Sequence, residues 1–191
     1  GGTGKTPTAL EIFKILKKLN YRVAMGKKFY SSQKDERMIL HKNSNLITSD
    51  TREKIVKIAI KNKNDIIVFD DGLQNKSIFY DIKIVCFDAN SWIGNGLLIP
   101  SGPLRESLDS LKNYDCVILK DNFKNNQNIE NAIKKVNKKI KIFTSEVKIK
   151  NLKTINKKNK YLIFSGIGNP NSFENTFLKN KINVIKKIVF P

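Results

Sequence analysis

The sequence contains little that would place it outside a reducing compartment or inside a membrane. Its 191 residues include two cysteines, Cys86 and Cys116, and each stands in a short apolar run typical of a buried strand. We therefore predict two buried free thiols in a reducing cytoplasm, not a disulfide or a metal site. The sequence shows no signal peptide and no apolar run long enough to span a bilayer.

Arginine is scarce in a chain that is otherwise strongly basic. Lysine and arginine together number 36 against 17 acidic residues, a net charge of +19, yet the only arginines are Arg22, Arg37, Arg52 and Arg105. Nucleic-acid sites usually show arginine interleaved with aromatic residues on one element, and because this chain has no such run we predict no nucleic-acid partner. Lysine, asparagine and isoleucine are abundant together, which indicates a bias toward A- and T-rich codons as much as selection for charge. The positive field still favours anionic partners, including nucleotides and an acidic lipid surface.

Histidine and tryptophan occur once each. His41 stands beside Lys42 in a polar stretch, so we predict a solvated side chain, not a catalytic one. Trp92 lies in a glycine-rich segment, where it fits a lipid or sugar contact as well as an ordinary loop anchor.

The first residues carry the motif around which the chain is organised. They read Gly1-Gly2-Thr3-Gly4-Lys5-Thr6-Pro7 and match the second half of the phosphate-binding pattern G-x-x-x-x-G-K-[ST]. In that pattern glycines let backbone N–H groups approach phosphate oxygens, the lysine reaches the β- and γ-phosphates, and the hydroxyl ligates Mg²⁺. Pro7 suits the first turn of a following helix, whose positive end points at the same phosphates. We predict that this stretch binds a nucleotide; a simple glycine turn before a helix is the alternative.

A second feature is a buried strand that ends in two carboxylates. Ile66 to Phe69 form a continuous apolar run typical of a parallel sheet covered on both faces, and Asp70 and Asp71 follow it. Ligands of open α/β sheets gather at such strand ends, and Mg²⁺ prefers carboxylate oxygens beside phosphates. We predict that Thr6 and one of the two acids, assigned to Asp71, hold the metal. By residue type alone, Asp35, Glu36 and Asp88 are candidates for a base toward an acceptor hydroxyl.

The order of elements predicts the fold class. Apolar strand-like runs alternate with helical patterns, which favours an α/β fold with a doubly wound, mostly parallel sheet of the P-loop NTPase type. We predict a core domain over residues 1–146 and, over 147–191, a hinge with an incomplete second lobe. Within this scheme we expect a loop over most of residues 26–49, a short helix opened by Pro103, and a linker with a surface hairpin over residues 148–160.

Longer motifs add a resemblance to a known family. Asp70-Asp71-Gly72-Leu73-Gln74, and residues 94–106 with the sequence GNGLLIPSGPLRE, resemble the signature of the tetraacyldisaccharide 4′-kinases, the lipid A kinases of Gram-negative bacteria. The opening GGTGKTP and residues 164–170, FSGIGNP, followed by Phe173, fit the same family in the same order. The resemblance covers essentially the whole chain.

The resemblance implies an ATP- and Mg²⁺-dependent phosphotransferase in lipid A biosynthesis. Its acceptor would be the 4′-hydroxyl of a tetraacylated disaccharide 1-phosphate, at the cytoplasmic face of the inner membrane, with no obligate protein partner. The implied roles are Lys5 and Thr6 at the phosphates and metal, Asp70 and Asp71 as the acidic pair at the metal, Asp35 as acceptor-side base, and Arg105, Glu106 and Gln74 at the substrate.

The sequence departs from the family pattern at several points. Asn75 stands where the family's D-D-G-L-Q-H motif has histidine, and residues 26–30, GKKFY, stand where the family has R-G-Y-G. The family's D-H-H motif and its N-terminal membrane helix would fall outside the sequence, so we expect an internal fragment. The rival hypotheses are a switch-type ATPase of the partitioning or metallochaperone kind, which uses a similar loop, and a basic lipid- or nucleic-acid-binding module.

Overall fold

The structure is a computed structural model that describes residues 3–30, 34–73, 75, 77–120, 126–167 and 169–190, without the side chains of 34–36. The chain divides into two compact units, Gly4–Lys83 and Ile84–Pro191, the latter together with Gly1–Thr3. The predicted boundary after residue 146 lies inside the second of these units, and the two-lobe assignment stays a prediction.

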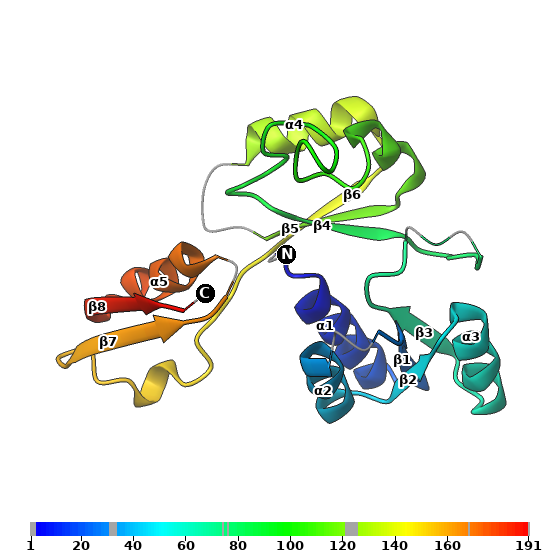
Figure 1. Cartoon of the computed structure of the whole chain (residues 1–191), viewed down its shortest axis with the longest axis horizontal. Helices are drawn as coiled ribbons and strands as arrows, with labels where there is room; N and C mark the ends of the chain where they lie inside the picture. The colour runs from blue at the N-terminus through cyan, green and yellow to red at the C-terminus, as the bar shows by residue number, and fades with distance from the viewer. Residues whose placement is uncertain are drawn as a thin grey trace. The chain divides into compact units, whose positions relative to one another are not determined.

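The first unit is a three-stranded parallel sheet with three helices (Figure 1). In chain order its elements are α1 (Lys5–Lys18), β1 (Val23–Lys28), α2 (Lys34–Asn43), β2 (Leu46–Ser49), α3 (Arg52–Lys61) and β3 (Ile66–Phe69). The strand order is β2-β1-β3, and both pairings of β1 are parallel. In the register of β1 with β3, Gly26 lies opposite Phe69.

Helices cover both faces of this sheet because β1 is apolar on both sides. Val23 and Met25 pack with Phe13 of α1, whereas Ala24, the residue between them, packs with Ile55 of α3. Alternate residues of a strand point to opposite faces, so a continuous apolar run can bury both faces at once. The predicted doubly wound parallel α/β arrangement is thereby confirmed for this unit.

The expectation of a loop over residues 26–49 was wrong. The strand β1 continues to Lys28, α2 follows, and β2 occupies Leu46–Ser49. Within the described part of α2 the fully buried apolar side chain is Leu40, while Met38 and Ile39 are more than half exposed. A helix that buries so little has no clear apolar period, and a four-residue strand is too short to show one.

The second unit contains two further parallel sheets. Its first part comprises β4 (Ile84–Asp88), a 3₁₀ helix η1 (Leu108–Asn113), β5 (Cys116–Lys120), α4 (Gln127–Val136) and β6 (Lys141–Ser145), with strand order β4-β5-β6. Its second part comprises a 3₁₀ turn η2 (Leu152–Thr154), β7 (Lys160–Ser165), α5 (Pro170–Lys179) and β8 (Asn183–Val189), in which β7 and β8 pair in parallel. Every strand pairing in the described chain is thus parallel, as expected for the fold class.

Two local expectations for this unit were wrong. Pro103 does not open a helix, because Leu104 forms an isolated bridge with Leu98 and the helical turn begins only at Leu108. Between residues 146 and 159, all of which are described, the regular element is the turn η2, and no hairpin forms there.

The two cysteines differ in burial, and neither forms a disulfide. Cys116 is buried as predicted, whereas Cys86 is only half-buried. Burial raises the pKa of the Cys116 thiol. Among the described residues, no helix combines the length and the apolar character needed to cross a bilayer.

Candidate functional site

The helix α1 begins directly at the predicted phosphate loop. Gly4 precedes it with φ of 85°, a left-handed conformation that glycine adopts without steric cost. Lys5 is the first helical residue, and Pro7 lies in the first turn as predicted. The first N–H groups of a helix have no intrahelical acceptor and carry positive partial charge, so this end of α1 favours an anion.

The structure brings Thr6 and Asp70 together. The Thr6 hydroxyl donates a hydrogen bond of 2.9 Å to Oδ2 of Asp70, which follows β3. The backbone N–H of Asp70 donates to the carbonyl of Gly26 on β1, which holds the acid at the end of the sheet. A hydroxyl and a carboxylate from two distant parts of the chain therefore meet beside the glycine turn.

Lys27 contacts the same carboxylate oxygen. Its ammonium lies 2.9 Å from Oδ2 of Asp70, and the side chains of Lys27 and Asp70 are only 3% and 1% exposed. Lys27 is not among the predicted site residues. Its signal in the sequence is a lysine that closely follows the apolar run Val23–Met25, and the structure buries it on the same strand.

The donor set suits a hard divalent cation. Oδ1 of Asp70 is buried and has no hydrogen-bond partner among the described residues, although it belongs to a carboxylate whose other oxygen accepts from Thr6 and Lys27. Carboxylate and hydroxyl oxygens are the ligands that Mg²⁺ prefers beside phosphates. The described part of the chain contains no cluster of three histidine, cysteine or acidic side chains.

The backbone after Asp70 is held by two side chains that were also missed. Arg52, buried at the start of α3, donates through Nη2 to the carbonyl of Asp71 at 2.8 Å, and the Tyr80 hydroxyl donates to the carbonyl of Gly72 at 2.9 Å. Asp71 adopts a left-handed backbone conformation with φ of 57°. Burial raises the pKa of Tyr80, whose ring also meets Phe69 edge-on. These contacts fix the turn that carries the second acid.

The predicted substrate-side pair lies in the second unit. Arg105 is exposed, and Glu106 accepts a hydrogen bond of 2.9 Å from the hydroxyl of Tyr114. Burial and this carboxylate raise the pKa of Tyr114 to about 12. Glu106 therefore has a local partner at the end of η1.

Several predicted residues lie outside what the structure describes. These are Gly1, Gly2, Gln74 and the side chain of Asp35, whose backbone belongs to α2. Thr3 lies in a bend before α1 and is half-buried. The roles given to all the predicted site residues stay predictions.

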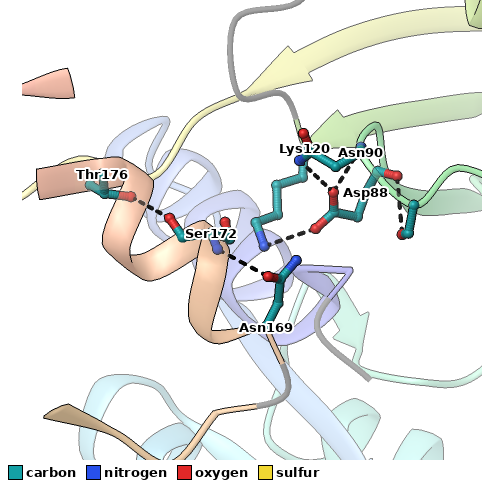
Figure 2. Close-up of polar contacts among 7 residues, drawn as sticks. Asp88, Asn90, Lys120, Asn169, Ser172 and Thr176 are labelled. Carbon is teal, nitrogen blue, oxygen red and sulfur yellow. Dashed lines mark hydrogen bonds and ion pairs between the residues drawn. The ribbon is translucent and has the colours of Figure 1, made fainter. Parts of the chain in front are cut away.

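A second polar cluster surrounds Asp88 at the end of β4 (Figure 2). Asn90 donates to Oδ1 through its backbone and its side-chain amide, at 3.0 and 2.9 Å, and Lys120 donates to Oδ2 at 3.2 Å. Burial on its own would raise the pKa of Asp88, but these hydrogen bonds lower it below its ordinary value. The cluster fixes the start of the glycine-rich loop. In that loop the Trp92 ring packs 4.9 Å from the Phe87 ring, which favours the loop-anchor interpretation of Trp92.

Figure 2 also shows Asn169, from the FSGIGNP motif, at the start of α5. The Asn169 side chain accepts from the backbone N–H of Ser172 at 3.0 Å, and Pro170 occupies the first turn. The Thr176 hydroxyl donates to the carbonyl of Ser172. In this motif, asparagine and proline therefore have a helix-capping role.

The glycine turn into α1, the parallel sheet covered on both faces, and the carboxylate beside Thr6 define a parallel α/β protein of the P-loop class. The family model described as tetraacyldisaccharide-1-P 4′-kinase matches residues 1–191. The chain belongs to this family.

Curated relatives agree with the family model. A tetraacyldisaccharide 4′-kinase of Pelagibacter ubique (strain HTCC1062) is 41% identical over 191 residues, which is 100% of this chain and 61% of that protein. The proteins of the same name from Rickettsia akari and Rickettsia bellii are each 32% identical and are covered over 62% and 63% of their length. The chain thus spans about three fifths of the relatives it matches.

Among solved structures, the hydrogenase maturation factor HypB from Archaeoglobus fulgidus aligns with a TM-score of 0.48 and 13% identity, over 95% of this chain and 86% of that one. A likeness of that degree carries no functional argument.

Proposed function

We propose that this chain contributes the nucleotide site of an ATP-dependent kinase that phosphorylates the 4′-hydroxyl of a tetraacyldisaccharide 1-phosphate in lipid A biosynthesis. The observation that carries the proposal is the contact between Thr6 and Asp70 beside the start of α1, in a chain that the family model matches throughout. A hydroxyl paired with the carboxylate of a strand end is the arrangement that P-loop proteins use at the metal-bound phosphates.

On the nucleotide side, the start of α1 would bind the phosphates through its backbone N–H groups and the Lys5 ammonium. Thr6 with Asp70 or Asp71 would hold Mg²⁺, which neutralises charge on the transferred phosphoryl group when it is bound. The buried Oδ1 of Asp70 supports this assignment because it lacks a partner among the described residues. Lys5 would stabilise the charge that develops in the transition state.

On the acceptor side, Asp35 would accept the proton of the 4′-hydroxyl. Arg105, Glu106 and Gln74 would contact the lipid disaccharide phosphate. Support comes from the family match and, for Arg105, from the residue type and its exposed position, since a guanidinium is well suited to pair with a phosphate.

Peripheral attachment to the cytoplasmic face of the inner membrane belongs to the same proposal. The loop that carries Arg105 also exposes three consecutive apolar side chains, those of Leu97, Leu98 and Ile99, at 51%, 47% and 61%. The net charge of +19 favours an anionic surface. A kinase attached to the membrane surface would reach an acylated substrate most directly.

The decisive experiment measures phosphoryl transfer by the full chain from labelled ATP to the tetraacyldisaccharide 1-phosphate, with ATP hydrolysis followed in parallel. We expect labelled lipid to form, and ATP consumption to depend on both the lipid and Mg²⁺. Hydrolysis that proceeds equally without lipid would contradict the kinase assignment and favour a switch-type ATPase.

A further inference from the structure

We propose that Lys27 is a positioning residue for the nucleotide site, which fixes the Asp70 carboxylate so that magnesium-bound nucleotide binds tightly. The inference rests on the proposed function, because it concerns the same site. It adds a residue that the sequence motifs do not contain.

The contact between Lys27 and Asp70 follows from the strand register. The neighbouring strands β1 and β3 run parallel, with Gly26 opposite Phe69. Lys27 follows Gly26 and Asp70 follows Phe69, so these two residues also lie side by side. The 2.9 Å ion pair therefore joins two adjacent strand ends at the edge of the sheet where the Thr6 hydroxyl also lies. Because backbone pairing determines it, the contact is not the chance meeting of two long surface side chains.

Stability does not explain why a lysine occupies this position. Met25, two residues earlier on the same strand, is fully buried, so the strand accommodates an apolar side chain of similar length. A buried ion pair is often no more stabilising than well-packed apolar residues, although removing one partner alone is strongly destabilising. The presence of a charged side chain that is only 3% exposed points to a role in orienting the Asp70 carboxylate.

The orientation of Asp70 supplies that role. Oδ2 accepts from both the Thr6 hydroxyl and the Lys27 ammonium, which together prevent rotation of the carboxylate. Oδ1 is left without a partner among the described residues. A carboxylate held in this way keeps one oxygen for a cation or for a water bound to it. Partners that orient such ligands typically change metal affinity by roughly 10–100-fold when they are removed.

The test compares ATP binding to the full chain by titration calorimetry, once with Mg²⁺ and once with EDTA. For Lys27→Met we expect binding in Mg²⁺ to weaken by roughly 10–100-fold, and binding in EDTA to change far less. Lys27→Arg, which keeps a cation beside Asp70, should recover much of the loss. The control is Lys54→Met, which removes an exposed lysine whose partner is Asp50, and it should match the wild type in both conditions.

The possible results distinguish a positioning role of Lys27 from phosphate binding and from a purely structural role. Equal weakening in Mg²⁺ and EDTA would make Lys27 a phosphate ligand and overturn the proposal, as would unchanged or tighter binding in Mg²⁺. If Lys27→Met lacks the wild-type circular dichroism spectrum, the comparison moves to Lys27→Gln, whose amide can still donate to Asp70. Misfolding of both variants would make Lys27 a residue of stability alone, against the proposal. Absence of ATP binding by the wild type would instead refute the proposed function.

Discussion

The Thr6 hydroxyl and the Asp70 carboxylate, 64 positions apart in the chain, lie 2.9 Å from one another. The contact joins the first turn of α1 to the end of β3, within one compact unit. It places an oxygen pair suited to Mg²⁺ next to a helix N-terminus suited to phosphate.

Replacing Thr6 tests this pair directly. We expect Thr6→Ala to weaken Mg²⁺-dependent ATP binding because the hydroxyl is lost, and Thr6→Ser to keep most of the affinity because the hydroxyl remains. Calorimetric titration of both variants measures the difference. Equal affinities for Thr6→Ala and wild type would show that the hydroxyl does not take part in metal binding.

Lys5 is expected to matter for transfer. In the proposed function the Lys5 ammonium faces the transferring phosphoryl group, so Lys5→Ala would remove that charge. Removal of one such stabilising group typically lowers turnover by roughly 10²–10³-fold. The matched control is Lys14→Ala on the same helix, where the lysine is about half exposed and paired with Glu11. Near-normal lipid phosphorylation by Lys5→Ala would refute the phosphate-loop assignment.

Asp35 is expected to act on the acceptor. Asp35→Ala should lower kcat by roughly 10²–10⁴-fold, the usual contribution of a general base, while the affinity for ATP stays nearly constant. Steady-state kinetics and ATP titration of the same preparation provide the comparison. Parallel losses in turnover and ATP affinity would move Asp35 from acceptor base to nucleotide ligand.

Gly26 is expected to be required by packing. A Cβ at Gly26 would lie 2.7 and 2.8 Å from two ring atoms of Phe69, the residue opposite it in the sheet. Such overpacking typically costs about 1–3 kcal/mol, so Gly26→Ala should lower the free energy of unfolding by that amount. Urea denaturation measures it. In Gly166→Ala, where the nearest atom is 3.7 Å away, crowding should add no comparable loss.

Acid is expected to weaken the cluster around Asp88. Because hydrogen bonds from Asn90 and Lys120 lower its pKa in the folded chain, this carboxylate stabilises the fold above its ordinary pKa of 3.8. The contribution is lost as the pH falls through the lower, folded-state pKa. Urea denaturation at pH 7 and at stepwise lower pH should show a steeper loss for wild type than for Asp88→Asn. Identical pH profiles would show that Asp88 does not contribute.

Several features of the site followed from the sequence because they depend on local chemistry. The glycine before Lys5, the helix after it and the apolar strand that ends in Asp70 each have a direct signature in residue type and spacing. The parallel fold class followed from alternating apolar runs, and the strands pair as expected. The family signature identified the chain because two uncommon motifs occur in the family's order.

The charged partners of the site depended on which strands and helices pack side by side. Lys27 and Arg52 read as two more basic residues in a basic sequence, and only strand register and helix packing place them against Asp70 and the carbonyl of Asp71. The residues of α2 whose side chains are described include too few buried ones to show a period. Local sequence thus determined the phosphate loop and the acid at the strand end. The tertiary structure decided which charges surround that acid, because a buried charge obtains its partner from whichever element packs beside it.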